Sequence, residues 1–175
     1  MIIRHFIEDQ KLIKQMLRRL KPTGDLTNNC LEIYVDPTTG EKWGKYEFEL
    51  EDQINYAIGL RLLPYPDTDK LIEIALTSSH IDEIHGAAAL LLDQEHSDHR
   101  EFREKLLNEI ETKIKDITLE RFNIIFNRAE LYDKSNKREI LGKHLNEIRN
   151  DADHFFNMSI KADELREKIT ATNSA

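Results

Sequence analysis

The spacing of apolar residues changes twice along this chain, and each change marks a different kind of secondary structure. From Phe6 to Leu20, apolar residues recur every three or four positions with lysines and arginines between them, which predicts an amphipathic helix with a basic face. Between residues 30 and 63, apolar and polar residues alternate, which predicts strands. Beyond residue 67 the helical spacing returns and continues to about Thr170.

The clearest local signal is "DPTTG", residues 36–40, between the first two predicted strands. Pro37 sets φ for a type I turn, Asp36 can accept a turn hydrogen bond, and Gly40 can take the left-handed conformation that closes a hairpin loop. After this turn, Tyr46 and Phe48 share an apolar strand face, and "INYAIGLRLLP" continues the alternation as a third strand. We therefore predict a three-stranded antiparallel meander, which is large enough to be stable when it packs on helices.

The helical half is predicted to consist of paired helices joined by short connections. We predict one α+β domain, mostly α, in which residues 1–66 form the N-terminal helix and the sheet, residues 67–170 form the helical half, and residues 171–175 are a disordered tail. Small residues in "HGAAA" allow a close helix approach that resembles a HEAT-type hairpin. Because no fixed repeat period is visible, a helical hairpin of an ordinary α+β domain is the alternative.

The last predicted helix, from about Lys137 toward Thr170, carries a stripe of residues at alternating steps of four and three. This is heptad spacing, which is typical of helices that pair with another helix. Its members are Leu141, Leu145, Ile148, Ala152, Phe155, Ser159, Ala162, Arg166 and Ile169. Self-association through the apolar early part, Leu141 to Phe155, is one hypothesis for function.

Charge is distributed unevenly along the chain. The net charge of −8 divides into +4 over residues 1–24, −11 over residues 25–95 and −1 over residues 96–175. A concentrated negative field repels nucleic acid and anionic lipid, and it speeds encounter with a basic protein. The alternative is that the acidic residues only keep the protein soluble.

The composition also predicts a compartment. No apolar run approaches the length of about 18 residues that a membrane span needs, and the start "MIIRHFIEDQ" has acidic residues where a signal peptide needs a longer apolar core. Cys30 is the single cysteine, which excludes an intramolecular disulfide and a cysteine set for zinc. We expect Cys30 to be buried and inert. A soluble cytoplasmic protein with no membrane and no nucleic-acid partner is the simplest interpretation.

Four histidines are the best candidates for chemistry. His80, His85, His96 and His99 alternate with carboxylates, a combination that suits zinc, nickel or iron. We favour surface histidines near a helix cap, because the chain has no HExxH motif, no GxSxG elbow and no glycine-rich phosphate loop. The sequence therefore predicts no catalytic residue, no metal and no cofactor, and a metal-dependent enzyme is the weakest of three hypotheses.

A single tryptophan is the best candidate for a binding anchor. Trp43 shares strand parity with Lys45, Glu47 and Glu49, and tryptophan is enriched among residues that dominate protein interfaces. The alternative is that Trp43 packs on the helices after a bulge at Gly44. The predicted partner-binding residues are Trp43, Glu47, Glu49, Glu51 and Asp52.

The segment "YVDPTTGEKWGKYEF", Tyr34 to Phe48, resembles a segment of bacterial immunity proteins that protect their producers against polymorphic toxins. In that family a D-P-x-x-G turn precedes W-x-x-Y on the next strand. The matching residues are Asp36, Pro37, Gly40, Trp43 and Tyr46. The family often continues into a glycine-rich strand, whereas the following strand here has only Gly59.

The resemblance implies a small acidic cytoplasmic inhibitor that binds a basic cognate toxin and has no catalysis of its own. Noncatalytic protein binding, as an immunity protein, is therefore the function we expect from the sequence. The alternative is a helical scaffold or regulatory protein that acts through its C-terminal helices.

Overall fold

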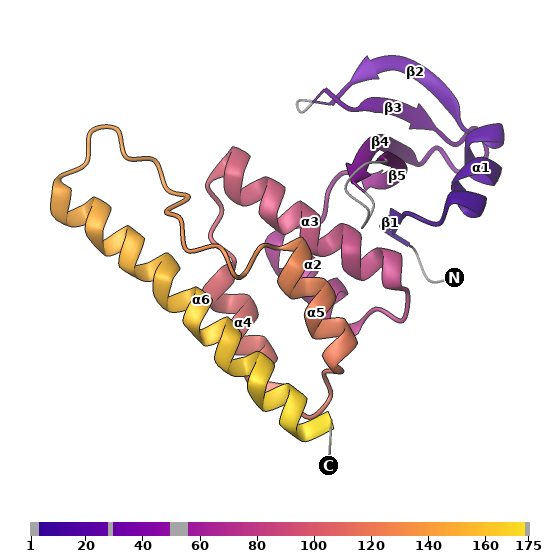
Figure 1. Ribbon diagram of the computed structural model, residues 1–175. Helices are drawn as coiled ribbons and strands as arrows, with labels where there is room; N and C mark the ends of the chain where they lie inside the picture. Colours follow the sequence, from indigo (N-terminus) through magenta and orange to yellow (C-terminus); the bar gives the residue numbers. More distant parts are fainter. Residues whose placement is uncertain (1–3, 28–29, 50–55, 174–175) are drawn as a thin grey trace. The chain divides into compact units, whose positions relative to one another are not determined.

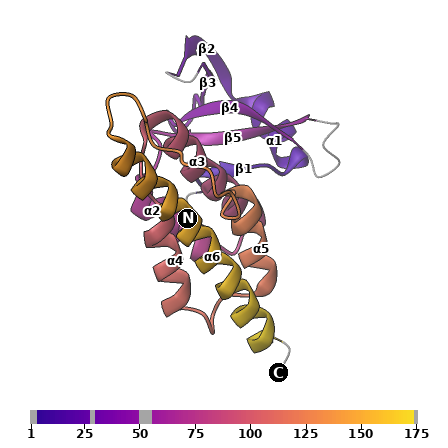
Figure 2. The ribbon, with the colours of Figure 1, turned by 60° about the vertical axis from the view of Figure 1, so that its left-hand side comes forward.

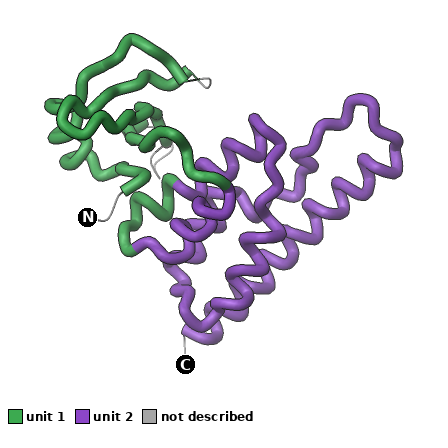
Figure 3. The backbone as a smooth tube through the Cα atoms, turned by 180° about the vertical axis from the view of Figure 1, so that it is seen from behind, with its two compact units in different colours: residues 1–67, 79–86 green, residues 68–78, 87–175 purple. Residues whose placement is uncertain are grey.

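The computed structural model describes residues 4–27, 30–49 and 56–173 of an α+β protein. Within these residues the chain forms six helices and a five-stranded antiparallel sheet (Figure 1). It divides into two compact units, shown in different colours in Figure 3. The sheet unit comprises residues 1–67 and 79–86, and the helical unit comprises residues 68–78 and 87–175.

The sheet unit contains five strands and one complete helix. In chain order these are β1 (Phe6–Ile7), α1 (Gln10–Arg19), β2 (Lys21–Leu26), β3 (Glu32–Val35), β4 (Lys42–Glu49) and β5 (Tyr56–Leu63). The order across the sheet is β1-β5-β4-β3-β2, and every neighbouring pair is antiparallel (Figure 2). The three strands predicted from the sequence correspond to β3, β4 and β5, and the sheet has two further edge strands.

The N-terminal helix is shorter than its apolar spacing predicted. Phe6 and Ile7 form β1 on the edge beside β5, so the expectation that Phe6 begins a helix is wrong. Helix α1 begins after Asp9, whose carboxylate accepts hydrogen bonds from the backbone N–H groups of Lys11 and Leu12, both at 2.8 Å. A side-chain cap of this kind sets where a helix begins, because it satisfies N–H groups that have no partner within the helix.

The segment "KPTGD", residues 21–25, lies in strand β2, ahead of the region where the sequence predicted strands. Its pairing with β3 shifts register between Pro22 and Leu26, and Gly24 lies in the left-handed region at φ +82°. Every residue of β2 is exposed. Proline is tolerated in an edge strand because its missing N–H costs no ladder hydrogen bond on the open side.

One face of the sheet packs against α1 to form the core of the sheet unit. The buried members of this core are Ile7, Ile13, Met16, Leu20, Trp43 and Leu60. Two glycines allow close approaches elsewhere in the unit. A Cβ on Gly59 would lie 2.2 Å from the ring of Tyr46, and a Cβ on Gly86 would lie 2.5 Å from Phe6.

The helical unit contains α2 (Thr68–Thr77), the part of α3 (Ile81–Asp98) that follows Gly86, α4 (Arg103–Thr112), α5 (Leu119–Arg128) and α6 (Leu145–Asn173). Helix α6 lies along α4 and α5 (Figures 1 and 2). The Arg121 guanidinium donates to the carbonyls of Ala75 and Ser78 at the end of α2, at 3.0 and 2.6 Å, where helix carbonyls lack partners. None of the described helices is long and apolar enough to cross a membrane.

The last helix differs from the predicted stripe at both ends. It begins at Leu145 rather than near Lys137, so Leu141 precedes it, and it continues to Asn173 where the sequence predicted a disordered tail. Its buried residues are Asp151, Phe155, Ser159, Ala162, Leu165 and Ile169. Phe155, Ser159, Ala162 and Ile169 of the heptad stripe therefore pack inside the unit, whereas Arg166 is exposed and Leu165 is buried beside it. Leu141 and Leu145, at the start of the stripe, are 82% and 69% exposed.

Candidate functional site

The predicted turn at residues 36–40 is confirmed. The N–H of Gly40 donates to the Asp36 carbonyl at 2.8 Å, the N–H of Thr38 donates to the Asp36 carboxylate at 2.9 Å, and Gly40 has φ +75°. The Asp36 carboxylate is buried and lies 2.7 Å from Arg19 of α1. The hydrogen bond from Thr38, and then the Arg19 charge, lower the pKa of Asp36. This aspartate therefore holds the turn and α1 together.

Trp43 lies in the core of the sheet unit rather than at its surface. It is 5% exposed and packs with Ile13 and Met16 of α1. The ladder passes without a bulge from Trp43 opposite Leu62 to Gly44 opposite Arg61. Strand parity correctly grouped Trp43 with the charged residues of β4, but α1 covers this part of that face, so Trp43 cannot be the exposed anchor that the sequence suggested.

The acidic members of the predicted binding set are only partly described. Glu47 is exposed on β4. Glu49 ends β4 with its side chain outside the described set, and Glu51 and Asp52 lie outside the described residues. The sheet unit also includes the basic α1, so it carries nine Lys and Arg against thirteen Asp and Glu, a net charge of −4. The helical unit carries the other −4, so the acidic segment 25–95 does not form a separate acidic body.

A buried polar cluster lies where β1 leads into α1. The Tyr46 hydroxyl donates to the Glu8 carboxylate at 2.7 Å, and the Arg61 guanidinium lies 4.1 Å from the centre of the Tyr46 ring. His85 Nδ1 lies 3.5 Å from the other Glu8 oxygen. Burial, and then the Glu8 charge, raise the pKa of Tyr46 far above its ordinary value, so Tyr46 is a neutral donor at all ordinary pH values.

The first turn of α3 is tied to the N-terminal segment within the same unit. The His5 N–H donates to the Glu83 carboxylate at 2.7 Å, and the Glu8 N–H donates to Asp82 at 3.2 Å. Arg4 also forms an ion pair with Asp82. These contacts explain why residues 79–86 belong to the sheet unit, and they give the cluster a structural role.

The four histidines do not assemble into a metal site. Within residues 4–27, 30–49 and 56–173, no group of three or more His, Cys, Asp or Glu side chains is arranged to hold a metal ion. Helix α3 ends at Asp98, and His99 follows it at φ +54°, so His96 and His99 do not share a helix face. Cys30 is exposed, contrary to the expectation that it is buried.

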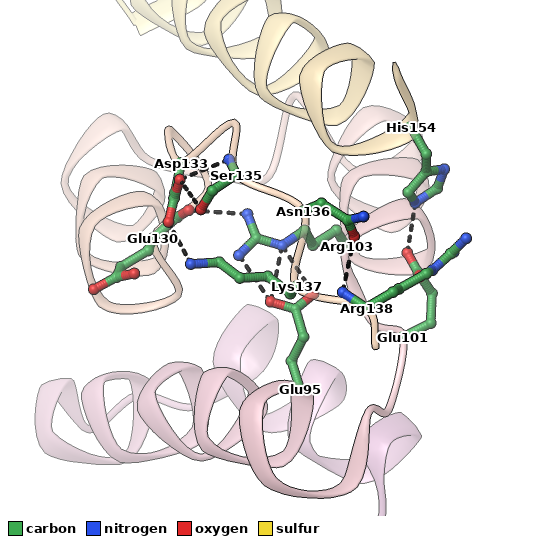
Figure 4. Close-up of polar contacts among 10 residues, drawn as sticks. All are labelled: Glu95, Glu101, Arg103, Glu130, Asp133, Ser135, Asn136, Lys137, Arg138 and His154. Atoms are coloured by element: carbon green, nitrogen blue, oxygen red, sulfur yellow. Dashed lines mark hydrogen bonds and ion pairs between the residues drawn. The ribbon is translucent and has the colours of Figure 1, made fainter. Parts of the chain in front are cut away.

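A second polar cluster lies in the helical unit (Figure 4). Arg103 is fully buried, and its Nε and Nη2 donate to the Glu95 carboxylate at 2.9 and 2.8 Å. Its Nη1 donates to the Glu130 carbonyl at 2.9 Å, and its guanidinium lies 5.4 Å from the Phe155 ring centre. This pair is not predicted from the sequence, because the charge pattern does not distinguish Arg103 from the exposed charged residues of a helix.

A second set of ion pairs holds the segment between α5 and α6. Arg138 donates to Asp151 at 2.5 Å and to Glu101 at 2.6 Å. His154 lies 2.7 Å from Glu101 (Figure 4). Lys143 donates to Asp151 at 2.7 Å. Burial favours a raised pKa for Glu101, but hydrogen bonds from Arg138 and His154 outweigh it and lower that pKa. The segment is therefore a fixed part of the helical unit.

Exposed apolar side chains gather on this segment and on the first half of α6. Among the described residues, nine large apolar side chains are exposed, and six of them lie within residues 132–160. These six, which we call the α6 surface, are Tyr132, Ile140, Leu141, Leu145, Phe156 and Ile160. Contiguous exposed apolar surface is a feature of interaction sites, and on α6 itself Leu145, Phe156 and Ile160 lie on one side of the helix.

Comparison with family models, curated proteins and solved structures gives no match for this chain. The function is therefore inferred from the residues of the chain itself.

Proposed function

We propose that this chain is a noncatalytic protein-binding protein that contacts its partner through the α6 surface. The observation that supports this proposal is the exposure of six large apolar side chains within residues 132–160, from 38% for Ile160 to 82% for Leu141. Burying such side chains against a partner releases them from water, which is the main favourable term in protein association.

The charges of the same stretch indicate what kind of surface the partner presents. Residues 132–160 contain five Lys or Arg and five Asp or Glu, so the stretch has no net charge. Several of these charges are already paired within the chain: Lys137 with Asp133, and Arg138 and Lys143 with Asp151. A mainly apolar partner surface of low net charge fits this stretch best, and we expect binding to depend little on salt.

The double variant Leu145→Ser/Phe156→Ser tests this proposal. Both side chains are exposed, so the substitutions leave the fold intact and remove only the apolar contact area. We expect proteins that copurify with the tagged full chain from native lysate to be lost in this variant. Ile81→Ser, which changes an exposed apolar residue of the sheet unit, is the matched control and should retain them. Equal recovery by both variants would exclude the α6 surface.

Toxin immunity is a second candidate, with a basic toxin domain as the partner. It is supported by the resemblance of residues 34–48, by the formation of the expected turn and by the exposure of Glu47. In this version Asp36, Trp43 and Tyr46 maintain the fold and the carboxylates make the contact. Binding to a basic domain encoded by a neighbouring gene should weaken as salt rises, and Glu47→Gln should slow association. Salt-independent binding with an unchanged association rate would argue against this candidate.

A further inference from the structure

We infer that the α6 surface binds a second copy of this chain, with the two α6 helices packed antiparallel about a two-fold axis beside Ala152. This inference rests on the proposed use of the α6 surface and names its partner. Three features of α6 support it: the spacing of the apolar residues, the small residue at their centre, and two opposite charges on one flank.

Five apolar residues of α6 lie on one side of the helix; Leu145, Phe156 and Ile160 are exposed, and Ile148 and Ala152 are half-buried. Leu145, Ile148, Ala152, Phe156 and Ile160 follow each other at steps of three, four, four and four residues. From Ile148 to Ile160 every step is four residues, so this row turns by about 40° per step and is inclined to the helix axis as an i±4 ridge. Two copies of the row lie along each other when the two helices cross at about 50°.

This face of α6 can pair with the same face of a second copy. A two-fold interface brings the same patch of both copies together, so the patch must complement its own rotated image. With the axis beside Ala152, the small side chain lets the two helices approach closely at the centre. When the two helices cross along these rows, Ile148 lies beside the partner's Phe156, and apolar residues meet apolar residues on both sides of the axis.

Two charges beside this face form no ion pair among the described residues. Arg149 and Asp153 are both exposed on the same flank, and neither forms an ion pair with another described residue. In an antiparallel pair, the two-fold axis brings the same flank of both helices together. Arg149 then lies within about two residues, roughly 3 Å along the helix axis, of the partner's Asp153. The symmetry produces this pair twice. A parallel arrangement joins opposite flanks and does not form it.

Charge reversal tests the inference by sedimentation equilibrium of the full chain. We expect the wild type to show a monomer–dimer equilibrium, and Arg149→Asp or Asp153→Arg to weaken dimerisation by about tenfold, because each replaces two attractions with two repulsions. The double variant Arg149→Asp/Asp153→Arg should restore the wild-type constant. Helix content measured by circular dichroism should be the same in all these chains, which separates the rescue from an i,i+4 pair within one helix. Ile81→Ser is expected to leave the equilibrium unchanged.

Disulfide trapping gives an independent measurement. On a Cys30→Ser background, Ala152→Cys places two thiols beside the axis, and oxidation should give a covalent dimer. Glu164→Cys, also exposed on α6 but 12 residues from the axis, should stay monomeric. Failure of Ala152→Cys to cross-link, or of the double charge variant to rescue, would overturn the antiparallel arrangement.

A wild-type chain that is monomeric up to about 200 µM would overturn the inference, since even weak specific association appears in this range. The proposed function fails differently. If the chain is monomeric but Leu145→Ser/Phe156→Ser still removes copurifying proteins, the α6 surface binds another protein and only the second copy is excluded. If that variant loses neither self-association nor copurifying proteins, the surface itself has no binding role.

Discussion

At the scale of single residues, the motif that resembles immunity proteins is largely accounted for by folding. Asp36 and Gly40 form the turn, Trp43 fills the core beneath α1, and Tyr46 donates to a buried carboxylate. Sequence parity grouped these residues on the correct strand faces. It could not show that α1 covers the Trp43 face, because the positions of a helix and a sheet depend on contacts that are distant in sequence.

Trp43→Ala should therefore lower the stability of the fold, whatever its effect on binding. Removing a buried tryptophan side chain leaves a cavity and should lower the free energy of unfolding by about 3–5 kcal/mol. Urea unfolding followed by circular dichroism measures this, since the variant has no other tryptophan for fluorescence. Glu47→Gln, an exposed change on the same strand, should stay within about 0.5 kcal/mol of the wild type. Equal stability of both variants would contradict the buried position of Trp43.

Gly59 and Gly44 form a matched pair for a second prediction at this scale. A Cβ at Gly59 would lie 2.2 Å from the Tyr46 ring, whereas a Cβ at Gly44 would lie at an ordinary 3.6 Å from Leu31. Gly59→Ala should therefore displace Tyr46 and cost about 1–3 kcal/mol. Gly44→Ala should cost less in the same urea unfolding measurement. The reverse order would show that Tyr46 does not lie over Gly59.

At the scale of elements, apolar spacing located most helices but not their ends. Strands β3, β4 and β5 lie where the alternation predicted strands, and helices α2 to α5 lie within the predicted helical half, because each element buries one regular face. The pattern missed β1, which has only two residues, and β2, which contains Pro22 and Gly24. The pairing of helices in HEAT-type hairpins stays a prediction. The heptad stripe predicted for the last helix does not act as one surface. Most of its later part packs within the helical unit, whereas its start is exposed.

The Glu95–Arg103 pair joins the end of α3 to the start of α4. Removing one partner of this pair should destabilise the fold more than removing both. Arg103→Met leaves the Glu95 carboxylate buried without its partner and should cost about 3–5 kcal/mol. The double variant Glu95→Leu/Arg103→Met should be more stable than this single variant, because no unpaired charge is left. Thermal unfolding of the three chains checks the order. A double variant less stable than Arg103→Met would show that the pair itself contributes the larger part.

The ion pairs around Arg138 give the helical unit a dependence on pH. Hydrogen bonds from Arg138 and His154 hold the pKa of Glu101 below its ordinary value of 4.5. Hydrogen bonds from Lys143 and Arg138 hold the pKa of Asp151 below its ordinary value of 3.8. A carboxylate with a lowered pKa in the folded state stabilises the fold above its ordinary pKa, and this contribution is lost as pH falls through the folded value. Unfolding free energy should therefore decline from about pH 4.5 downward.

Arg138→Gln is the control for this pH dependence. It removes the donor that Glu101 and Asp151 share, so the decline below about pH 4.5 should be shallower in the variant. Urea unfolding at a series of pH values compares the two slopes. Parallel curves for the wild type and the variant would mean that these carboxylates are not stabilised by Arg138.

At the scale of the whole molecule, the distribution of charge along the sequence differs from its distribution in the fold. The basic α1 and the acidic strands belong to one unit, and each unit has a net charge of −4. Counting charge by sequence segment separated residues that the fold brings together. The exposed apolar part of α6 was likewise visible in the sequence only as one portion of a longer stripe, because spacing does not reveal which half packs internally.

The irregular edge strand β2 has a consequence for how copies of the chain can meet. Its Pro22 lacks an N–H, Gly24 turns the backbone out of line, and at the opposite edge β1 offers only two residues. Among the described residues, neither edge of the sheet presents a long, straight row of backbone donors and acceptors with which a strand of another molecule could pair, and this disfavours edge-to-edge aggregation. The inferred pairing of two α6 helices about a two-fold axis instead gives a closed dimer that cannot add further copies through the same surface.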